Sequence, residues 1–236
     1  AEGAEVVVFP ELSTTGYVYE SREELRDVLA GGDGVTALAD ASRSRGVVIV
    51  AGVARLVSDE IHNCAVLIDN GDVLASYSKT HLWDTEKAIF TPGGSLPPVC
   101  HTSRGLIGLA ICYDMEFPEL FRHLAISGAE LVAAPTNWPA GFEPETASGP
   151  FNSELLRVMG NASTNRMFVA VACRTGVERG QDWVPATSMV GPDGYPIART
   201  GLLPETLHCE IDLAEARNKR ISDNNDVLSD RRTDLY

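Results

Sequence analysis

Two ways of joining strands occur along this chain, and together they restrict the folds that it can adopt. Apolar runs predict strands at 5–9, 47–54, 62–69, 73–79, 106–111, 131–134, 168–173, 186–190, 195–198 and 207–211. Helical patterns occupy 23–30, 35–45, 118–127 and 151–166. Some successive strands are joined by hairpin turns, at Asn70-Gly71 and Asp193-Gly194, whereas others are separated by a helix. Both connections in one chain require a mixed sheet or two sheets, with helices packed outside.

Length and composition indicate one soluble domain over residues 1–236. The chain is 44% hydrophobic and 22% charged, and no linker, repeat or low-complexity tract divides it. Its formal net charge of −14 disfavours nucleic acid and anionic membrane as partners. No apolar run approaches the roughly 18 residues that a membrane span needs.

The cysteines argue against a disulfide framework and against a zinc site. The chain has 5 of them, an odd number, scattered through apolar runs without a CxxC pair: Cys64, Cys100, Cys112, Cys173 and Cys209. We therefore expect a reducing, cytoplasmic setting. Residues 217–236 are polar without periodicity, which predicts either a disordered tail or an arm that orders against a partner.

Three predicted strands lead to a reactive side chain at their carboxyl ends. The strands at 5–9, 73–79 and 106–111 lead to Glu11, Lys79 and Cys112 respectively. Active sites of α/β proteins gather at the carboxyl ends of strands. A thiol can attack a carbonyl carbon, a carboxylate can take the proton, and a cation can stabilise the oxyanion. Cys112 also precedes a predicted helix, whose positive end would favour a thiolate.

Three sequence segments resemble the signature segments of the carbon–nitrogen hydrolases, the nitrilase superfamily, and occur in that family's order. They are FPELSTTGY at 9–17, YSKTHL at 77–82 and ICYD at 111–114. The resemblance extends over the whole chain, because APTNW at 134–138 and NRMFV at 165–169 are also similar to family segments. Three motifs in order, each on the expected element, are far more specific than one.

The resemblance implies a fold and a site. The fold is a four-layer α-β-β-α sandwich of two mixed β-sheets with outer helices. The site is a Glu11-Lys79-Cys112 triad with Glu86 as a second glutamate that positions the substrate, without cofactor or metal. The family also implies a homodimer or higher homo-oligomer. Because family members begin with a strand and most of a helix before the equivalent of Ala1, we expect that strand and part of the first helix to be missing here.

Each candidate has an ordinary structural interpretation as well. Cys112 alone could be a core residue, Glu11 a loop acid, Lys79 a solvated strand end, and Glu86 half of a charged surface pair. Their common placement in matching motifs favours the functional interpretation. Three aromatic residues are expected to line the substrate pocket, although each could instead belong to the core: Tyr17, Tyr113 and Trp138.

The residues after the nucleophile bear on the substrate. True nitrilases usually carry Trp-Glu there, whereas Tyr113-Asp114 resembles the amidase branches. Glu116 stands where omega-amidases tend to carry arginine, which disfavours acidic substrates. We therefore expect a small neutral aliphatic amide to be hydrolysed to a carboxylic acid and ammonia through a thioester. The alternatives are a nitrile, an N-carbamoyl compound, or a catalytically silent scaffold protein.

Overall fold

The computed structural model describes residues 3–142, 150–201 and 205–235, and two larger β-sheets dominate it. The first sheet has the order β1-β2-β3-β4, formed by Val6–Val8, Val48–Val57, Glu60–Asp69 and Asp72–Ser78. The second has the order β12-β11-β8-β7-β6-β5, formed by Pro196–Arg199, Ser188–Val190, Phe168–Cys173, Leu131–Thr136, Gly105–Leu109 and Val99–Thr102.

Both sheets are mixed, as the two kinds of connection predicted. In the first sheet β1 runs parallel to β2, while β2, β3 and β4 pair antiparallel. In the second sheet β6, β7 and β8 are parallel and the outer strands are antiparallel. The hairpin predicted at Asn70-Gly71 joins β3 to β4, and both residues have the positive φ angles that this turn requires.

Strand β2 shows why the molecule has layers. Its side chains alternate in direction, so that Val48 and Val50 enter the core between the two sheets. Ile49 and Ala51 enter a second cluster beneath helix α2, Val35–Arg45. Most of β2 is therefore buried on both faces of the first sheet.

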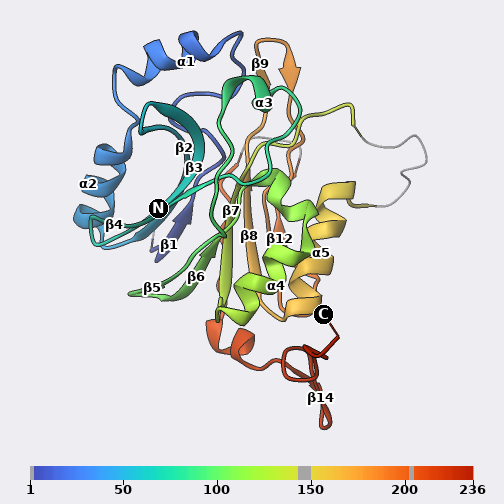
Figure 1. Ribbon diagram of the computed structural model, residues 1–236. Coiled ribbons are helices and arrows are strands. Elements are labelled where there is room, and N and C mark those ends of the chain that lie inside the picture. The colour runs from blue at the N-terminus through green and yellow to red at the C-terminus, as the bar shows by residue number, and fades with distance from the viewer. Residues whose placement is uncertain (1–2, 143–149, 202–204, 236) are drawn as a thin grey trace.

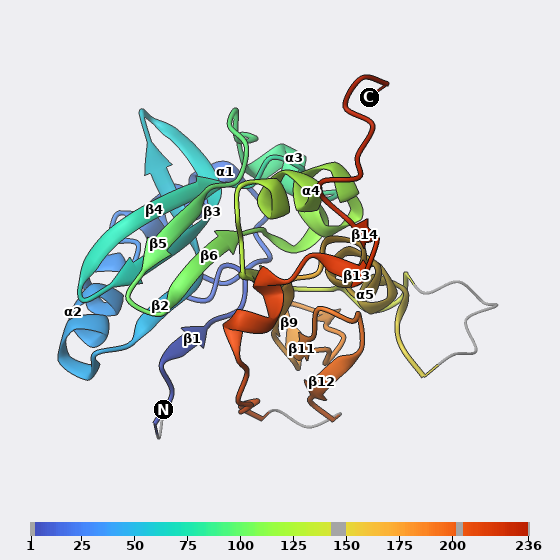
Figure 2. The same ribbon diagram turned by 90° about the horizontal axis from the view of Figure 1, so that it is seen from below.

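Helices cover the outer face of each sheet (Figure 1). Helices α1 (Arg22–Leu29) and α2 lie outside the first sheet, and α4 (Pro118–Ile126) and α5 (Ser153–Asn165) lie outside the second. The view from below shows the same succession of layers (Figure 2). The predicted α-β-β-α sandwich is confirmed. The short elements are α3 (Glu86–Ile89), η1 (Cys112–Glu116), η2 (Leu213–Arg217), β9 (Val177–Glu178), β10 (Gln181–Asp182), β13 (Arg220–Ser222) and β14 (Asn225–Asp226).

In the C-terminal part, the predicted strand at 207–211 was wrong, and the expectations for the last segment need correction. Residues 207–211 form no strand and have no ladder partner in the described structure; they line a cavity of about 800 Å³ together with residues of β1, β8 and β11. Residues 217–235 are ordered, so the expectation of a disordered tail was wrong, while the arm on a partner stays a prediction. Part of this segment packs against the chain itself, since Lys219 Nζ donates to the carbonyls of Asn165 and Arg166 at the end of α5.

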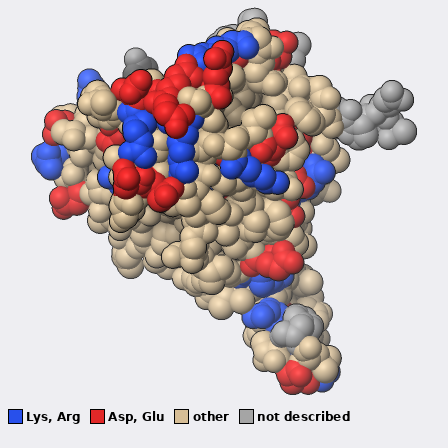
Figure 3. Space-filling view, turned by 45° about the horizontal axis from the view of Figure 1, so that its top comes forward, with Lys and Arg blue, Asp and Glu red and all other residues tan. Residues whose placement is uncertain are grey.

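Charged side chains of both signs are interspersed on the face shown in Figure 3. Around α1 they form ion pairs, including Arg26 with Asp59 and Arg179 with Glu24. Exposed pairs of this kind contribute about 0–1 kcal/mol each, so the fold depends on its apolar layers. Among the described helices, none has both the length and the apolar character that crossing a membrane demands.

Candidate functional site

Glu11 reaches the interior because the backbone after β1 passes unusually close to β2. A Cβ atom on Gly52 would lie only 2.4 Å from the Cα of Glu11, so position 52 admits only glycine without a backbone shift. The Ser13 N–H then donates to the Gly52 carbonyl at 2.8 Å. Leu12, which follows Glu11, has a φ of 49°, in the left-handed region that residues other than glycine rarely adopt. The segment that carries Glu11 is therefore tightly constrained.

Lys79 lies one residue beyond β4 and continues the β3–β4 ladder, because its N–H donates to the Asn63 carbonyl at 2.8 Å. Lys79 is two residues after Tyr77, which faces the core between the sheets, so its side chain points to the same face. The third charged residue, Glu86, begins α3 and accepts a hydrogen bond from the Trp83 N–H at 2.8 Å. Glu11, Lys79 and Glu86 are all buried.

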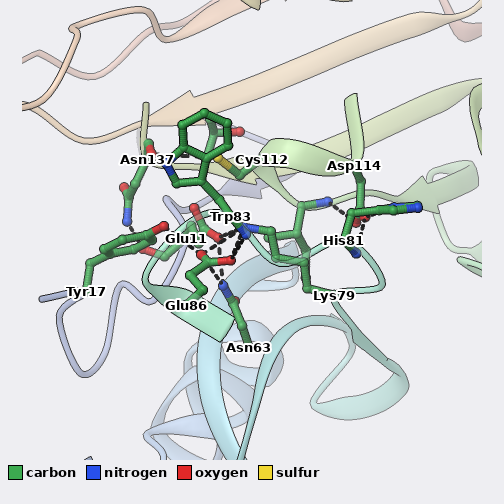
Figure 4. A network of polar contacts seen from close by, with 12 residues as sticks. Glu11, Tyr17, Asn63, Lys79, His81, Trp83, Glu86, Cys112, Asp114 and Asn137 are labelled. Carbon is green, nitrogen blue, oxygen red and sulfur yellow. Dashed lines mark hydrogen bonds and ion pairs between the residues drawn. The ribbon is translucent and has the colours of Figure 1, made fainter. Parts of the chain in front are cut away.

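These three charges meet in one hydrogen-bonded cluster (Figure 4). Lys79 Nζ lies 2.8 Å from Glu11 Oε1 and 2.9 Å from both oxygens of Glu86. Asn63 Nδ2 donates to Glu11 Oε1 at 2.7 Å and to Glu86 Oε1 at 3.3 Å. Tyr17 donates its phenol to Glu86 Oε1 at 2.6 Å. Within the described part of the chain, the buried Glu11 Oε2 has no hydrogen-bond partner.

Cys112 approaches this cluster from the second sheet. It is the first residue of η1 and has a φ of 44°, a strained conformation of the kind that costs of order 1–3 kcal/mol and gathers at functional sites. Its Sγ donates to the Asn137 carbonyl at 3.6 Å, and Asn137 Nδ2 donates to the Glu11 carbonyl at 2.7 Å. Asn137 thus joins the thiol segment of one sheet to the carboxylate segment of the other.

The surroundings of Cys112 do not match the expectation that a helix N-terminus stabilises its thiolate. The α-helix begins only at Pro118, and Cys112 lies in a short 3₁₀ turn before it. Burial and then the charge of Glu11 raise the pKa of Cys112 well above its ordinary value, so the resting thiol keeps its proton. Burial would lower the pKa of Lys79, but Glu11 and Glu86 raise it well above its ordinary value. Burial raises the pKa of Glu11 to about 7.

Aromatic side chains lie around the thiol. The ring of Trp83 contacts Tyr113 and Phe142 edge to face, with centroids 5.0 and 5.4 Å away. Tyr17 contacts Trp183 in the same manner at 4.9 Å. Tyr17 belongs to the charged cluster through its hydrogen bond to Glu86, and Tyr113 directly follows Cys112 and packs on Trp83. Trp138 packs in the buried core that also contains Cys112.

Several residues of this site were not identified from the sequence. Asn63 lies in the middle of an apolar strand, and the polar interruption was its one signal. Trp83 follows the YSKTHL segment and Asn137 lies within the APTNW segment, but neither side chain carries a reactive group. Across 3–142, 150–201 and 205–235, the His, Cys, Asp and Glu side chains form no group of three that could hold a metal ion.

Known proteins are similar to this chain in sequence and in fold. The family model described as carbon–nitrogen hydrolase matches residues 1–221. A protein named nitrilase from Pyrococcus abyssi is 35% identical over 239 residues, which cover 100% of this chain and 87% of the relative. An (R)-stereoselective amidase from a Pseudomonas species is 33% identical over 237 residues, covering 98% of this chain and 81% of that enzyme.

Solved structures of an amidase have a fold similar to that of this chain. An amidase from Nesterenkonia sp. AN1, in a variant that shows the result of Michael addition of acrylamide at the active site cysteine, has a TM-score of 0.79 at 30% identity. That alignment covers 99% of this chain and 85% of the amidase. These findings also support a cysteine nucleophile. The chain therefore belongs to the carbon–nitrogen hydrolase family, the nitrilase superfamily, and is a hydrolase of non-peptide carbon–nitrogen bonds.

Proposed function

We propose that this enzyme hydrolyses small neutral aliphatic amides to a carboxylic acid and ammonia, with Glu11, Lys79, Cys112 and Glu86 as its catalytic residues. The observation that carries the proposal is the asymmetry of Glu11. Its Oε1 is held by Lys79 and Asn63, whereas its buried Oε2 has no partner within the described structure. A buried carboxylate oxygen left open beside a thiol suits a general base.

In the first half of the reaction, Cys112 transfers its proton to Glu11 Oε2 and its sulfur attacks the amide carbon. The Lys79 ammonium and the Tyr113 backbone N–H stabilise the oxyanion, and a single donor of this kind contributes about 2.7–4 kcal/mol. Glu11 then returns the proton to the amide nitrogen as the carbon–nitrogen bond breaks. Ammonia leaves and a thioester remains on Cys112.

In the second half, Glu11 takes a proton from water, whose oxygen attacks the thioester carbon. The carbon–sulfur bond breaks, the acid leaves, and the proton returns to Cys112. Glu86 keeps Lys79 and the substrate amide in place, because it already accepts hydrogen bonds from Lys79, Tyr17 and Trp83. Burial and Glu86 raise the pKa of Tyr17 well above its ordinary value, so the phenol remains a donor.

The charges near the site favour a neutral substrate. Lys79 is already paired with two glutamates, and Arg174, which lies over the Trp183 ring, is paired with Glu178. Glu116, the last residue of η1, pairs with Arg157 at 2.6 Å, so its charge is balanced by an arginine. Tyr17, Tyr113 and Trp138 are proposed as substrate-pocket residues. Structures of the similar Nesterenkonia amidase contain acrylamide or the acetamide moiety of fluoroacetamide at the active site cysteine, and both are small and neutral.

The proposal is tested by ammonia release from a panel of aliphatic amides, with wild-type protein and Cys112→Ala. We expect ammonia from short neutral amides and none above background from the variant. The matched control is Cys209→Ser, which changes an exposed thiol and should retain wild-type activity. Ammonia release that survives Cys112→Ala would contradict the mechanism.

A nitrile is the second candidate substrate, because the Pyrococcus relative is named a nitrilase. Each amide in the panel is therefore paired with the nitrile of the same carbon skeleton, and an N-carbamoyl compound is added. We expect the amide to have the higher kcat/KM in each pair. Faster hydrolysis of the nitriles would assign the enzyme to that substrate class instead.

We also propose a homodimer of this single domain. Exposed apolar side chains on neighbouring outer helices support it, since Ile126 on α4 is 52% exposed and Leu156 on α5 is 53% exposed. Light scattering after gel filtration should give twice the chain mass. A monomer mass at micromolar concentration would contradict this proposal.

A further inference from the structure

A buried carboxylate beside the site has no part in the proposed chemistry. Asp114 lies two residues after Cys112 and is 0% exposed. A carboxylate removed from water is costly unless hydrogen bonds satisfy its oxygens. The contacts of Asp114 therefore indicate what it does.

Asp114 links two separate segments of the active site (Figure 4). Its Oδ2 accepts from the Ile111 N–H at 3.1 Å and from the Tyr77 phenol at 2.9 Å. Its Oδ1 accepts from the His81 N–H at 3.2 Å and lies 3.0 Å from His81 Nδ1. One carboxylate thus binds the residue before Cys112, the strand end before Lys79 and the loop after Lys79.

Each linked segment carries a catalytic group in a constrained place. Cys112 has the strained φ of 44° immediately after Ile111, whose N–H Asp114 fixes. Lys79 stands between Tyr77 and His81, both of which Asp114 contacts. We propose that Asp114 is a positioning residue that holds the Cys112 turn and the Lys79 segment in one fixed arrangement. This inference rests on the proposed catalytic roles of Cys112 and Lys79.

The role requires a carboxylate, and an amide of the same shape cannot replace it. Each oxygen of Asp114 accepts a hydrogen bond from a backbone N–H, Ile111 on one side and His81 on the other. In Asp114→Asn the NH₂ group must occupy one of these two places, where it opposes a backbone donor that cannot turn around. Either orientation of the amide therefore releases one of the two segments.

The experiment compares three variants for kcat, KM, thermal midpoint and the pH dependence of Cys112 alkylation by iodoacetamide, located by peptide mass spectrometry. Asp114→Asn breaks the link. Tyr77→Phe removes the phenol's hydrogen bond to Asp114, together with its contacts to the Thr80 hydroxyl and N–H, and leaves the Ile111 and His81 N–H groups bonded to Asp114. Asp69→Asn is the matched control, because Asp69 also accepts a backbone N–H, from Ser103, and is 9% exposed. It lies roughly 20 Å from Asn63 along β3.

We expect Asp114→Asn to lower kcat by about 100-fold with little change in KM, because misplacing reacting groups costs about that much. Its alkylation midpoint should fall toward the ordinary thiol value of about 8.5 as Cys112 leaves its buried place near the charge of Glu11. Asp69→Asn should lower the thermal midpoint alone. The proposal is overturned if Asp114→Asn lowers the thermal midpoint but leaves kcat and the alkylation midpoint as in Asp69→Asn.

Should Asp114→Asn show no cooperative unfolding transition, Tyr77→Phe decides. A several-fold fall in kcat at unchanged KM supports the proposal, and wild-type kcat overturns it. Failure of the proposed function can be told apart from failure of the proposed role of Asp114. In that case wild-type protein hydrolyses no amide or nitrile, while the alkylation midpoints still report whether Asp114 positions Cys112.

Discussion

At the scale of single residues, the site depends on which oxygen of Glu11 is left open. Lys79 and Asn63 hold Oε1, whereas the buried Oε2 has no hydrogen-bond partner within the described structure. Burial raises the pKa of this carboxyl to about 7, although Lys79 and Asn63 both act to lower it. A general base must be deprotonated to act, so activity should increase with pH through this range.

The pH dependence of kcat/KM tests this balance. In the wild-type enzyme we expect kcat/KM to rise with pH with a midpoint near 7, the pKa of Glu11. Asn63→Ala removes a hydrogen bond to the ionised carboxylate, which disfavours the charged form and should move the midpoint to higher pH. The control Asn165→Ala removes a buried amide in α5 that donates to Asn161. Identical midpoints in wild type and Asn63→Ala would contradict the account.

The sequence was sufficient for the proposed reactive residues but not for Asn63. Glu11, Lys79 and Cys112 each follow an apolar strand and each belongs to a recognisable motif. Asn63 belongs to neither class, and its place depends on how β3 pairs with β4. Next to the turn, Asp69 pairs with Asp72. If this register continued unchanged along the two strands, Asn63 would lie opposite Ser78. An irregularity between Leu67 and Ile68 shifts the pairing by one residue.

At the scale of elements, that one-residue shift brings the side chains of the site together. Beyond the irregularity Cys64 pairs with Ser78, so Asn63 stands opposite Lys79 and both face Glu11. A shift of one residue turns every side chain to the other face of a strand. No local sequence pattern specifies such a bulge, because it reflects packing of the whole sheet.

A second element-scale feature is the close approach of the Glu11 segment to β2, which Gly52→Ala tests. The added Cβ would meet the Glu11 Cα at 2.4 Å, so the backbone must move and carry the proposed general base with it. We expect a fall in kcat of about 10-fold or more, since misplacement of about 1 Å costs up to 100-fold. The control is Gly160→Ala in α5, where a Cβ meets nothing within 4 Å.

Gly160→Ala should keep wild-type kcat and stabilise the protein by about 0.5–1 kcal/mol, because alanine is the better helix residue. Both quantities come from denaturant titration and steady-state kinetics on the same preparations. If Gly52→Ala keeps the wild-type kcat, the close approach of the Glu11 segment to β2 is not required for activity.

At the scale of the whole molecule, the site lies between two sheets that each supply part of it. Glu11 and Lys79 come from the ends of strands in the first sheet, and Cys112 follows a strand of the second. The apolar core between the sheets sets their separation, and Leu67 is one of its fully buried members. The layers could be predicted from the motifs. The unpaired segment at 207–211 could not, because strand formation there depends on a neighbouring edge.

Leu67→Ala tests the contribution of this core. Truncation of a fully buried leucine costs about 2–5 kcal/mol in the free energy of unfolding. Leu74→Ala on the neighbouring strand is the control, because Leu74 is 42% exposed and its loss should cost less than about 0.5 kcal/mol. Equal costs for the two variants, measured by denaturant titration, would show that the inter-sheet core is not what holds the layers together.

The central claim is that Cys112 carries the acyl group of a small amide. Rapid acid quenching during turnover, followed by intact-protein and peptide mass spectrometry, tests it most directly. We expect one adduct, located on Cys112, that increases the protein mass by the mass of the amide minus that of ammonia. This adduct should be absent from Cys112→Ala. Turnover of the amide without an acyl adduct on Cys112, or with the adduct on another residue, would contradict it.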